Sequence, residues 1–241
     1  MSEVGTYDAV VLAGGRGSRL GGVEKPLLRR RGRSLLDGVL DAVTDASRIV
    51  VVGPPSLAAH VAGHTLVRED PPLGGPVPAI AAGLAALPAR DAPVVLLAAD
   101  LVDPAAAVAA LVAAYPAVVA PSAAAAETVP HEGIAAPGSV RPEAHAAAGT
   151  AQGGPTSDGV IAVDPDGRRQ PLLAIYRGPA LRDALTAQSA LGPLDGLPLR
   201  RLIDPLDLTE VPLPADALRD LDTAADAAQL GVDLDPGHPP A

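Results

Sequence analysis

Residues 10–26 read Val-Val-Leu-Ala-Gly-Gly-Arg-Gly-Ser-Arg-Leu-Gly-Gly-Val-Glu-Lys-Pro, an apolar strand that runs into a glycine-rich turn holding cations. Glycines at positions 14, 15 and 17 can adopt backbone angles closed to other residues, so amides can point inward and a base or phosphate can come close. Arg19 and Lys25 add fixed positive charge for phosphate oxygens. The stretch therefore predicts a loop that holds a nucleoside triphosphate.

Two better-known glycine loops do not fit this stretch. The phosphate loop of P-loop enzymes requires a Gly-Lys pair, and the chain contains none. The dinucleotide fingerprint Gly-x-Gly-x-x-Gly would need a third glycine where Leu20 stands. Both classes are therefore excluded.

Composition indicates one α/β domain without a membrane segment. Hydrophobic residues make up 48% of 241 residues, yet Phe, Trp and Cys are absent. A core of Val, Leu, Ile and Ala suits parallel strands covered by helices. Without cysteine there is no disulfide, zinc–thiolate site or thiol nucleophile. No apolar run approaches the roughly 20 residues that span a bilayer, and no signal-like start is present, so we expect a cytoplasmic protein without a membrane partner.

Charge is unevenly distributed along the chain. The net charge of -10 argues against a nucleic-acid partner, which needs a basic face. Against that acidic background, cations cluster around the glycine loop at Arg16, Arg19, Lys25, Arg29, Arg30, Arg31 and Arg33. The cluster suits a polyphosphate substrate. Taken alone, the run 29–33 fits a solvated turn better than a ligand contact.

Hydrophobic runs alternate with helical patterns through the first half of the chain. We expect strands at 7–12, 48–52, 65–67 and 94–98, and helices starting at Ser34, at 54–56 and after the turn at 74–76. Asp103 is expected to cap the next helix, with Pro104 at its first position. This alternation predicts a parallel sheet with right-handed crossovers.

The second half is less regular. Residues 121–157 read as a low-complexity insertion in a single domain of residues 1–232, and 233–241 as a disordered tail. Between them we expect a hairpin of strands at 159–163 and 171–176, a helix at 179–188 and a strand at 208–211. A last helix is capped within 220–226.

Asp100 follows the most hydrophobic strand. In open α/β sheets ligands bind beyond the carboxyl ends of the strands, so Asp100 and the glycine loop should face each other. Mg²⁺ prefers one or two carboxylates together with phosphate oxygens, and Asp100 is the first candidate ligand because Asp103 already serves as the cap. Asp222 is a second candidate, although it could instead cap the last helix. Arg19 and Lys25 would bind the phosphate oxygens of the triphosphate.

The spacing Leu-Ala-Gly-Gly-x-x-x-Arg-Leu-Gly-Gly-x-x-Lys-Pro resembles the opening signature of the MobA-like nucleotidyltransferases, in particular the molybdenum cofactor guanylyltransferases. Further along, Asp70 and the segment to Ile80 are similar to the family's Asp and Gly-Pro-Leu-Ala-Gly-Ile-like segment. Ala99-Asp100 stands where the family carries its magnesium Asp. Residues 169–172 resemble its Gln-Pro-Leu strand, and residues 220–226 its C-terminal motif.

The resemblance implies a three-layer, Rossmann-like nucleotidyltransferase fold with a mostly parallel central sheet. It implies transfer of GMP from GTP to the phosphate of molybdopterin or the molybdenum cofactor, with Mg²⁺ as cofactor. Arg19 and Lys25 would then stabilise the pyrophosphate that is released. The catalytic residues would be Arg19, Lys25 and Asp100, and the metal ligands Asp100 and Asp222. The nucleotide would contact Leu12, Ala13, Gly14, Gly15, Lys25, Asp70 and Asp100.

The residues leave three functions open. Gly14 leaves room for a purine where related cytidylyltransferases usually carry alanine, which favours GTP over CTP. The same loop could serve a CTP-dependent molybdopterin cytidylyltransferase or another small-molecule nucleotidyltransferase. Departures from the family pattern at Pro78, Ala79 and Asp220 keep open a third possibility, a non-catalytic maturation factor that binds either nucleotide or a partner such as a molybdoenzyme or its chaperone.

Overall fold

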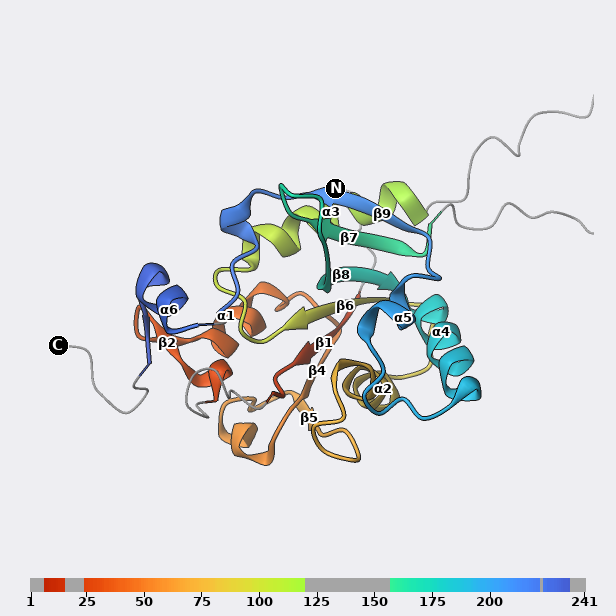
Figure 1. Cartoon of the computed structure of the whole chain (residues 1–241), viewed down its shortest axis with the longest axis horizontal. Helices are drawn as coiled ribbons and strands as arrows, with labels where there is room; N and C mark the ends of the chain where they lie inside the picture. The colour runs from red at the N-terminus through yellow and green to blue at the C-terminus, as the bar shows by residue number, and fades with distance from the viewer. Residues whose placement is uncertain (1–6, 16–23, 120–156, 222, 235–241) are drawn as a thin grey trace, which may run out of the picture.

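The computed structural model describes residues 7–15, 24–119, 157–221 and 223–234. Its centre is a seven-stranded sheet in the order β5-β4-β1-β6-β8-β7-β9 (Figure 1). The strands are β1 (Asp8–Leu12), β4 (Arg48–Val52), β5 (Thr65–Val67), β6 (Pro93–Ala98), β7 (Gly159–Val163), β8 (Arg169–Arg177) and β9 (Leu208–Pro212). In this sheet β8 runs antiparallel to both of its neighbours, and the other pairs are parallel. The predicted mostly parallel α/β sheet is confirmed.

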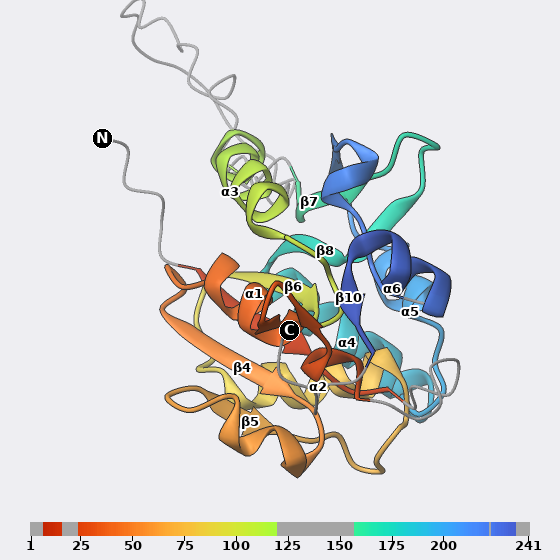
Figure 2. The same ribbon diagram turned by 90° about the vertical axis from the view of Figure 1, so that its left-hand side faces the viewer.

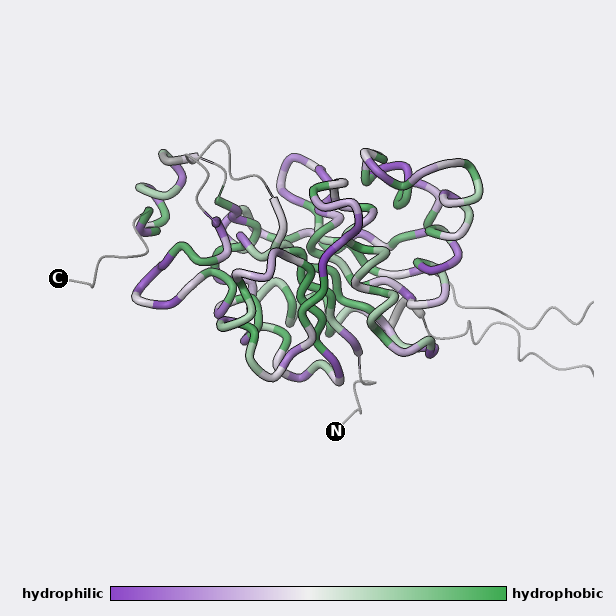
Figure 3. The backbone as a smooth tube through the Cα atoms, turned by 90° about the horizontal axis from the view of Figure 1, so that it is seen from below, coloured by the Kyte–Doolittle hydropathy of each residue, from purple (hydrophilic) through white to green (hydrophobic). Residues whose placement is uncertain are grey.

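Helices cover both faces of the sheet, which makes three layers (Figures 1 and 2). On one face lie α1 (Leu35–Ala42) and α3 (Ala105–Val119); on the other lie α2 (Pro76–Ala86), α4 (Gly178–Leu191) and α5 (Leu199–Ile203). Strand side chains alternate between the layers, so Val11 packs with α1 and α3 while Val10 packs with α2 and α4. Figure 3 shows the result, a hydrophobic centre with polar loops around it.

Two helices follow closely from their sequences. At α1, Ser34 Oγ accepts from the Asp37 amide at 3.0 Å and the Asp37 carboxylate accepts from the Ser34 amide at 3.1 Å, so the predicted capping box is confirmed. In α2, a Cβ at Gly83 would stand 2.5 Å from Val10 Cγ1. The helix therefore packs against β1 at a distance that only glycine permits here.

A second, small sheet was not predicted. It joins β2 (Arg29–Arg30), β3 (Arg33–Ser34) and β10 (Val232–Asp233), with α6 (Ala224–Leu230) packed on it over a small separate core. Asp233 is thus part of a strand paired with Arg29, rather than the start of a tail. This sheet lies beyond the carboxyl ends of β1 and β6 (Figures 1 and 2).

Two local predictions were wrong. The helix expected at 54–56 is a short 3-10 turn, η3 (Pro55–Ala59). Asp103 does not cap α3: its φ is 55°, outside the extended range typical of a cap, and its carboxylate forms an ion pair with Arg30. The side chain serves the small sheet instead of the helix.

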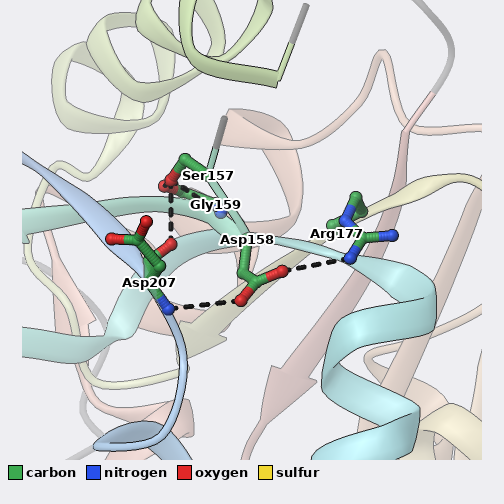
Figure 4. A network of polar contacts seen from close by, with 5 residues as sticks. All are labelled: Ser157, Asp158, Gly159, Arg177 and Asp207. Carbon is green, nitrogen blue, oxygen red and sulfur yellow. Dashed lines mark hydrogen bonds and ion pairs between the residues drawn. The ribbon is translucent and has the colours of Figure 1, made fainter. Parts of the chain in front are cut away.

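Polar contacts within the protein gather where the parallel strands begin, which we call the amino-end edge of the sheet (Figure 4). Asp158 accepts a hydrogen bond from Arg177 Nη2 at 3.0 Å and another from the Asp207 amide at 3.2 Å. At the same edge the Asp8 carboxylate, 1% exposed, forms an ion pair with Arg90. Both carboxylates therefore have partners within the fold, whereas Arg177 Nε is buried without a hydrogen-bond partner among the described residues.

The predicted insertion, 121–157, falls outside the described residues except for Ser157. The Ser157 hydroxyl lies 2.8 Å from the carbonyl oxygens of Gly159 and Asp207, and either oxygen can accept a hydrogen bond from it. In the chain as far as it is described, no helix has the length and apolar character that crossing a bilayer requires.

Candidate functional site

The glycine loop leaves the carboxyl end of β1 as an extension of the sheet. The amide of Ala13 donates to Val52 O at 2.8 Å, and Leu12 O accepts from the Ala99 amide at 2.9 Å, which ties the loop to both neighbouring strands. Beyond this point Gly14 and Gly15 are exposed. Gly15 has φ 152°, and an added Cβ there would meet no atom of the described residues within 4 Å. The loop backbone is therefore open to an approaching ligand.

Lys25 and Asp100 meet although they are distant in sequence. Lys25 opens the short 3-10 helix η2 (Lys25–Leu27), and Asp100 follows β6. Lys25 Nζ lies 3.4 Å from Asp100 Oδ2, and the two side chains are 20% and 25% exposed. A half-buried pair of this kind interacts more strongly than one in open solvent and stays accessible to a ligand.

A cavity of about 620 Å³ lies at this edge of the sheet. Small-molecule sites typically occupy about 300 to 1,000 Å³, so a nucleotide and part of an acceptor can fit. Its walls include Leu12, Ala13, Gly14, Gly15, Glu24, Lys25, Glu69, Leu73, Gly75, Ala98, Ala99, Asp100 and Leu172. The structure thus brings together the predicted residues of the first loop, Lys25 and Asp100.

Asp70 is placed differently from its neighbour Glu69. Asp70 is exposed and does not line the cavity, whereas Glu69 lines it and is only 7% exposed. Glu69 Oε1 accepts from the Leu73 amide at 2.9 Å. The sequence analysis missed Glu69 because two adjacent acids after a strand give no sign of which one faces inward. The assignment of Asp70 to nucleotide binding stays a prediction.

Glu24 is a second cavity residue that the sequence analysis missed. It precedes Lys25, is exposed, and accepts a hydrogen bond from Ser56 Oγ at 2.5 Å. The contact joins the glycine-loop segment to η3. An acid within a stretch of cations was the signal that could have identified Glu24. The sequence analysis considered only the positive charges of that stretch.

The C-terminal segment is brought alongside Asp100. Leu101 and Asp220 form an isolated antiparallel bridge, and the Val102 amide donates to Arg219 O at 2.8 Å. Asp222 and Arg19 themselves lie outside the described residues. The last helix, α6, is capped by Thr223, whose hydroxyl accepts from the Asp226 amide at 3.1 Å.

The donor set fits a divalent cation bound together with a substrate. Among the described residues no group of three or more His, Cys, Asp or Glu side chains could hold a metal by itself. Mg²⁺ in nucleotide sites is commonly held by one or two carboxylates plus phosphate oxygens and water. Asp100 on the cavity wall meets that lesser requirement.

A family model described as MobA-like NTP transferase domain matches residues 9–156, more than half of the chain. One curated relative, molybdenum cofactor guanylyltransferase of Rhodopseudomonas palustris, is 42% identical over 87 residues, covering 35% of this chain and 41% of that protein. Another, adenosylcobinamide-phosphate guanylyltransferase of Methanocaldococcus jannaschii, is 58% identical over 33 residues, covering 14% of this chain and 17% of that protein. The chain therefore aligns with less than half the length of either relative.

Solved structures resemble the fold over nearly its whole length. Molybdopterin-guanine dinucleotide biosynthesis protein A from Archaeoglobus fulgidus has a TM-score of 0.54 at 18% identity, covering 93% of this chain and 96% of that one. 2-C-methyl-D-erythritol 4-phosphate cytidylyltransferase from Thermus thermophilus has a TM-score of 0.53 at 19% identity, covering 93% and 97%. At these identities the likeness concerns the fold alone.

Proposed function

We propose that this chain, which belongs to the MobA-like NTP transferase domain family, transfers GMP from GTP to the phosphate of molybdopterin, forming the guanine dinucleotide cofactor and releasing pyrophosphate. The observation that carries the proposal is the meeting of Lys25 and Asp100 in the wall of a cavity opened by Gly14 and Gly15. A cation for phosphate oxygens and a carboxylate for a divalent metal are the two groups that this transfer needs most.

The chemistry requires charge stabilisation more than a protein nucleophile. A phosphate oxygen of the acceptor attacks the α-phosphorus of GTP. A new phosphorus–oxygen bond forms to the acceptor. The bond between the α-phosphorus and the oxygen that bridges the α- and β-phosphates breaks, and its electron pair leaves with pyrophosphate. Lys25 lines the cavity, and its ammonium would stabilise the charge that grows on the leaving group. An interaction that strengthens in the transition state raises the rate rather than merely the affinity.

Magnesium completes the proposed site. Held by Asp100 and phosphate oxygens, it would supply the charge neutralisation that a single lysine cannot. Asp222 and Arg19 belong to the proposal as a second metal ligand and a second phosphate-binding cation. In this scheme Asp100 orients the metal, while the open glycine backbone admits the nucleoside.

The curated relatives favour GTP and leave the acceptor to be tested. Both are named as guanylyltransferases, but one name gives the molybdenum cofactor and the other adenosylcobinamide phosphate. The match to the molybdenum cofactor enzyme covers 35% of this chain against 14% for the other, which favours molybdopterin. The fold shared with a cytidylyltransferase makes CTP the alternative nucleotide.

The deciding experiment incubates the protein with Mg²⁺, GTP and molybdopterin, and follows pyrophosphate release together with the mass of the product. We expect the guanine dinucleotide and equimolar pyrophosphate, and neither without Mg²⁺. Matched reactions replace GTP by CTP, or molybdopterin by adenosylcobinamide phosphate. Turnover confined to CTP or to the other acceptor would overturn the proposed substrate pair.

Calorimetry tests whether the protein binds nucleotide at all. We expect Mg²⁺-dependent affinity for GTP. Absence of any nucleotide affinity, with a molybdoenzyme or its chaperone captured as a partner, would support the maturation-factor hypothesis instead.

A further inference from the structure

Two ion pairs join the same two segments of the chain beside the cavity. Lys25 and Arg30 lie on the segment that runs from η2 into β2. Asp100 and Asp103 lie on the turn between β6 and α3. Lys25 Nζ stands 3.4 Å from Asp100 Oδ2. Arg30 Nη1 forms an ion pair with Asp103 Oδ2 a few residues further along each segment, so the two segments are tied together twice.

The two pairs differ in their access to a ligand. Lys25 and Asp100 line the cavity, whereas Arg30 and Asp103 do not. A polyphosphate bound with a divalent cation would attract Lys25 to its phosphate oxygens and Asp100 to the cation, so the contact between these two side chains would open. A ligand in the cavity does not compete for the second pair. The Arg30–Asp103 pair can therefore hold the two segments together while the first pair is engaged with the ligand.

The Arg30 guanidinium is itself fixed by the small sheet. Its side chain is 18% exposed, and Nε donates a hydrogen bond to Leu230 O at 2.8 Å. The backbone of Arg30 also pairs with Val232 of β10. The Asp103 side chain is 67% exposed, and an ion pair with so exposed a partner contributes little to stability. We therefore expect the pair to act on the geometry of the two segments more than on the stability of the fold.

Asp103 stands where the turn after β6 changes direction. Its φ is 55°, and the preceding Val102 amide donates to Arg219 O at 2.8 Å. Val102 and Leu28 are both buried in the small core, which keeps the two segments close. Apolar packing has no preferred direction, whereas a charge-assisted hydrogen bond does. The ion pair therefore fixes the orientation of the turn, and with it the position of Asp100 at the start of that turn.

We infer that Arg30 is a positioning residue, which acts through Asp103 to keep Lys25 and Asp100 at the spacing that nucleotidyl transfer needs. The inference rests on the proposed function, because it takes Lys25 and Asp100 as the groups that bind phosphate and metal. A displacement of about 1 Å in a catalytic group can lower a rate by about 100-fold. A pair that adds little stability can therefore still have a large effect on turnover.

The test breaks the ion pair from each side. Asp103→Asn removes the charge and suits the positive φ, which asparagine adopts more readily than most residues. Arg30→Gln removes the opposite charge and keeps an amide that can donate to Leu230 O. We expect each variant to lower kcat by about 10-fold, with little change in the KM for GTP or in the melting temperature. The double variant should lose no more than either single variant, because both remove the same interaction.

Arg30→Lys separates the charge from the contact with the small sheet. Lysine and glutamine can both donate to Leu230 O, but only lysine can pair with Asp103. Arg30→Lys should therefore recover most of the kcat that Arg30→Gln loses. Equal kcat values in these two variants would overturn the inference.

Hydrogen exchange reports on the turn without turnover. The Val102 amide, which donates to Arg219 O, should exchange at least about 5-fold faster in Asp103→Asn than in wild type when both are saturated with Mg²⁺ and GTP. An unchanged exchange rate would show that the pair does not fix the turn, and would overturn the inference.

The matched control is Asp41→Asn. Asp41 Oδ2 lies 2.5 Å from Arg33 Nη2 of the same hairpin, and this pair joins the hairpin to α1 instead of the turn after β6. The same chemical change there should leave kcat and the exchange of the Val102 amide unaltered. Wild-type kcat per folded molecule in Asp103→Asn, or additive losses in the double variant, would overturn the inference and leave the proposed function intact. If wild type itself turns over no GTP, the proposed function fails first.

Discussion

Charged residues differ between the amino-end edge of the central sheet, where the parallel strands begin, and the carboxyl-end edge, where they end. At the amino-end edge, Asp8 pairs with Arg90, and Asp158 with Arg177 and the Asp207 amide. At the carboxyl-end edge, Lys25 and Asp100 meet on the wall of a cavity of about 620 Å³. The carboxylates of the first kind are bound by protein partners and do not line that cavity, although Arg90 and Arg177 are 38% and 30% exposed, whereas Lys25 and Asp100 line it. The comparison teaches that the ion pairs differ in location, on a cavity wall or away from it, rather than in burial.

The largest effect is expected at the carboxyl-end edge. Asp100→Ala should lower turnover by about 1,000-fold, because losing the proposed metal ligand and its transition-state charge stabilisation costs that order. The melting temperature should hardly change, since Asp100 borders a solvated cavity. Steady-state kinetics beside thermal unfolding measures both quantities.

Lys25→Ala is the companion variant. It should likewise lower turnover strongly and leave the melting temperature nearly unchanged. Wild-type turnover in either variant would remove that residue from the proposed chemistry, and a large fall in melting temperature would show that this edge is structural after all.

The next largest effect belongs to the amino-end edge. Arg90→Ala leaves the Asp8 carboxylate, 1% exposed, without its cation. Removing the cation beside a buried carboxylate is destabilising, so the free energy of unfolding should fall. Urea unfolding gives the value. Turnover per folded molecule should stay at the wild-type level, and a specific loss of turnover would break the contrast between the edges.

A smaller effect is expected in the glycine loop. Gly14→Ala adds a methyl group whose nearest neighbour would be Glu69 Oε1 at 4.0 Å, so the fold should tolerate it. The methyl group would occupy space that the ligand needs. We expect about 10-fold weaker nucleotide binding, which equals about 1.4 kcal/mol of binding free energy, and no change in the stability of the fold. Calorimetry with GTP measures the affinity. Unaltered affinity would place the base elsewhere in the cavity.

The smallest effect concerns alkaline pH at the amino-end edge. Burial raises the pKa of Tyr115 to about 12; Asp91 adds to the rise and Arg177 opposes it. The unfolded chain has a tyrosine pKa near 10, so the stabilising contribution is present below about pH 10 and lost as pH rises toward 12. Tyr115→Phe should therefore make the free energy of unfolding fall less steeply over that range. Burial also raises the pKa of Tyr176, so some slope should remain. Equal slopes in both proteins would contradict the prediction.

The fold could be predicted to a large extent because its signals are local. Strands 48–52 and 65–67 coincide with β4 and β5, since continuous apolar runs bounded by turns leave few alternatives. The Ser34 capping box is likewise a short-range pattern, and the structure confirms it. The glycine loop was enough to identify the family, which the match over residues 9–156 confirms.

What could not be predicted depends on long-range contacts. The small sheet pairs Arg29 with Asp233 across nearly the whole chain, and two-residue strands carry no periodicity that a sequence can reveal. The sequence predicts Asp103 as a helix cap, but its carboxylate forms an ion pair with Arg30 instead. The predicted roles of Arg19 and Asp222 remain predictions.

The sequence by itself determined that an apolar strand ends in an open glycine loop, followed by a lysine and, much later, by an aspartate after another buried strand. Only the tertiary structure decided that Lys25 and Asp100 lie 3.4 Å apart and that Glu69 faces inward while Asp70 faces out. The physical reason is that backbone preferences and apolar periodicity act over a few residues. The direction of a side chain at a strand end is fixed by the neighbouring segments that pack around it.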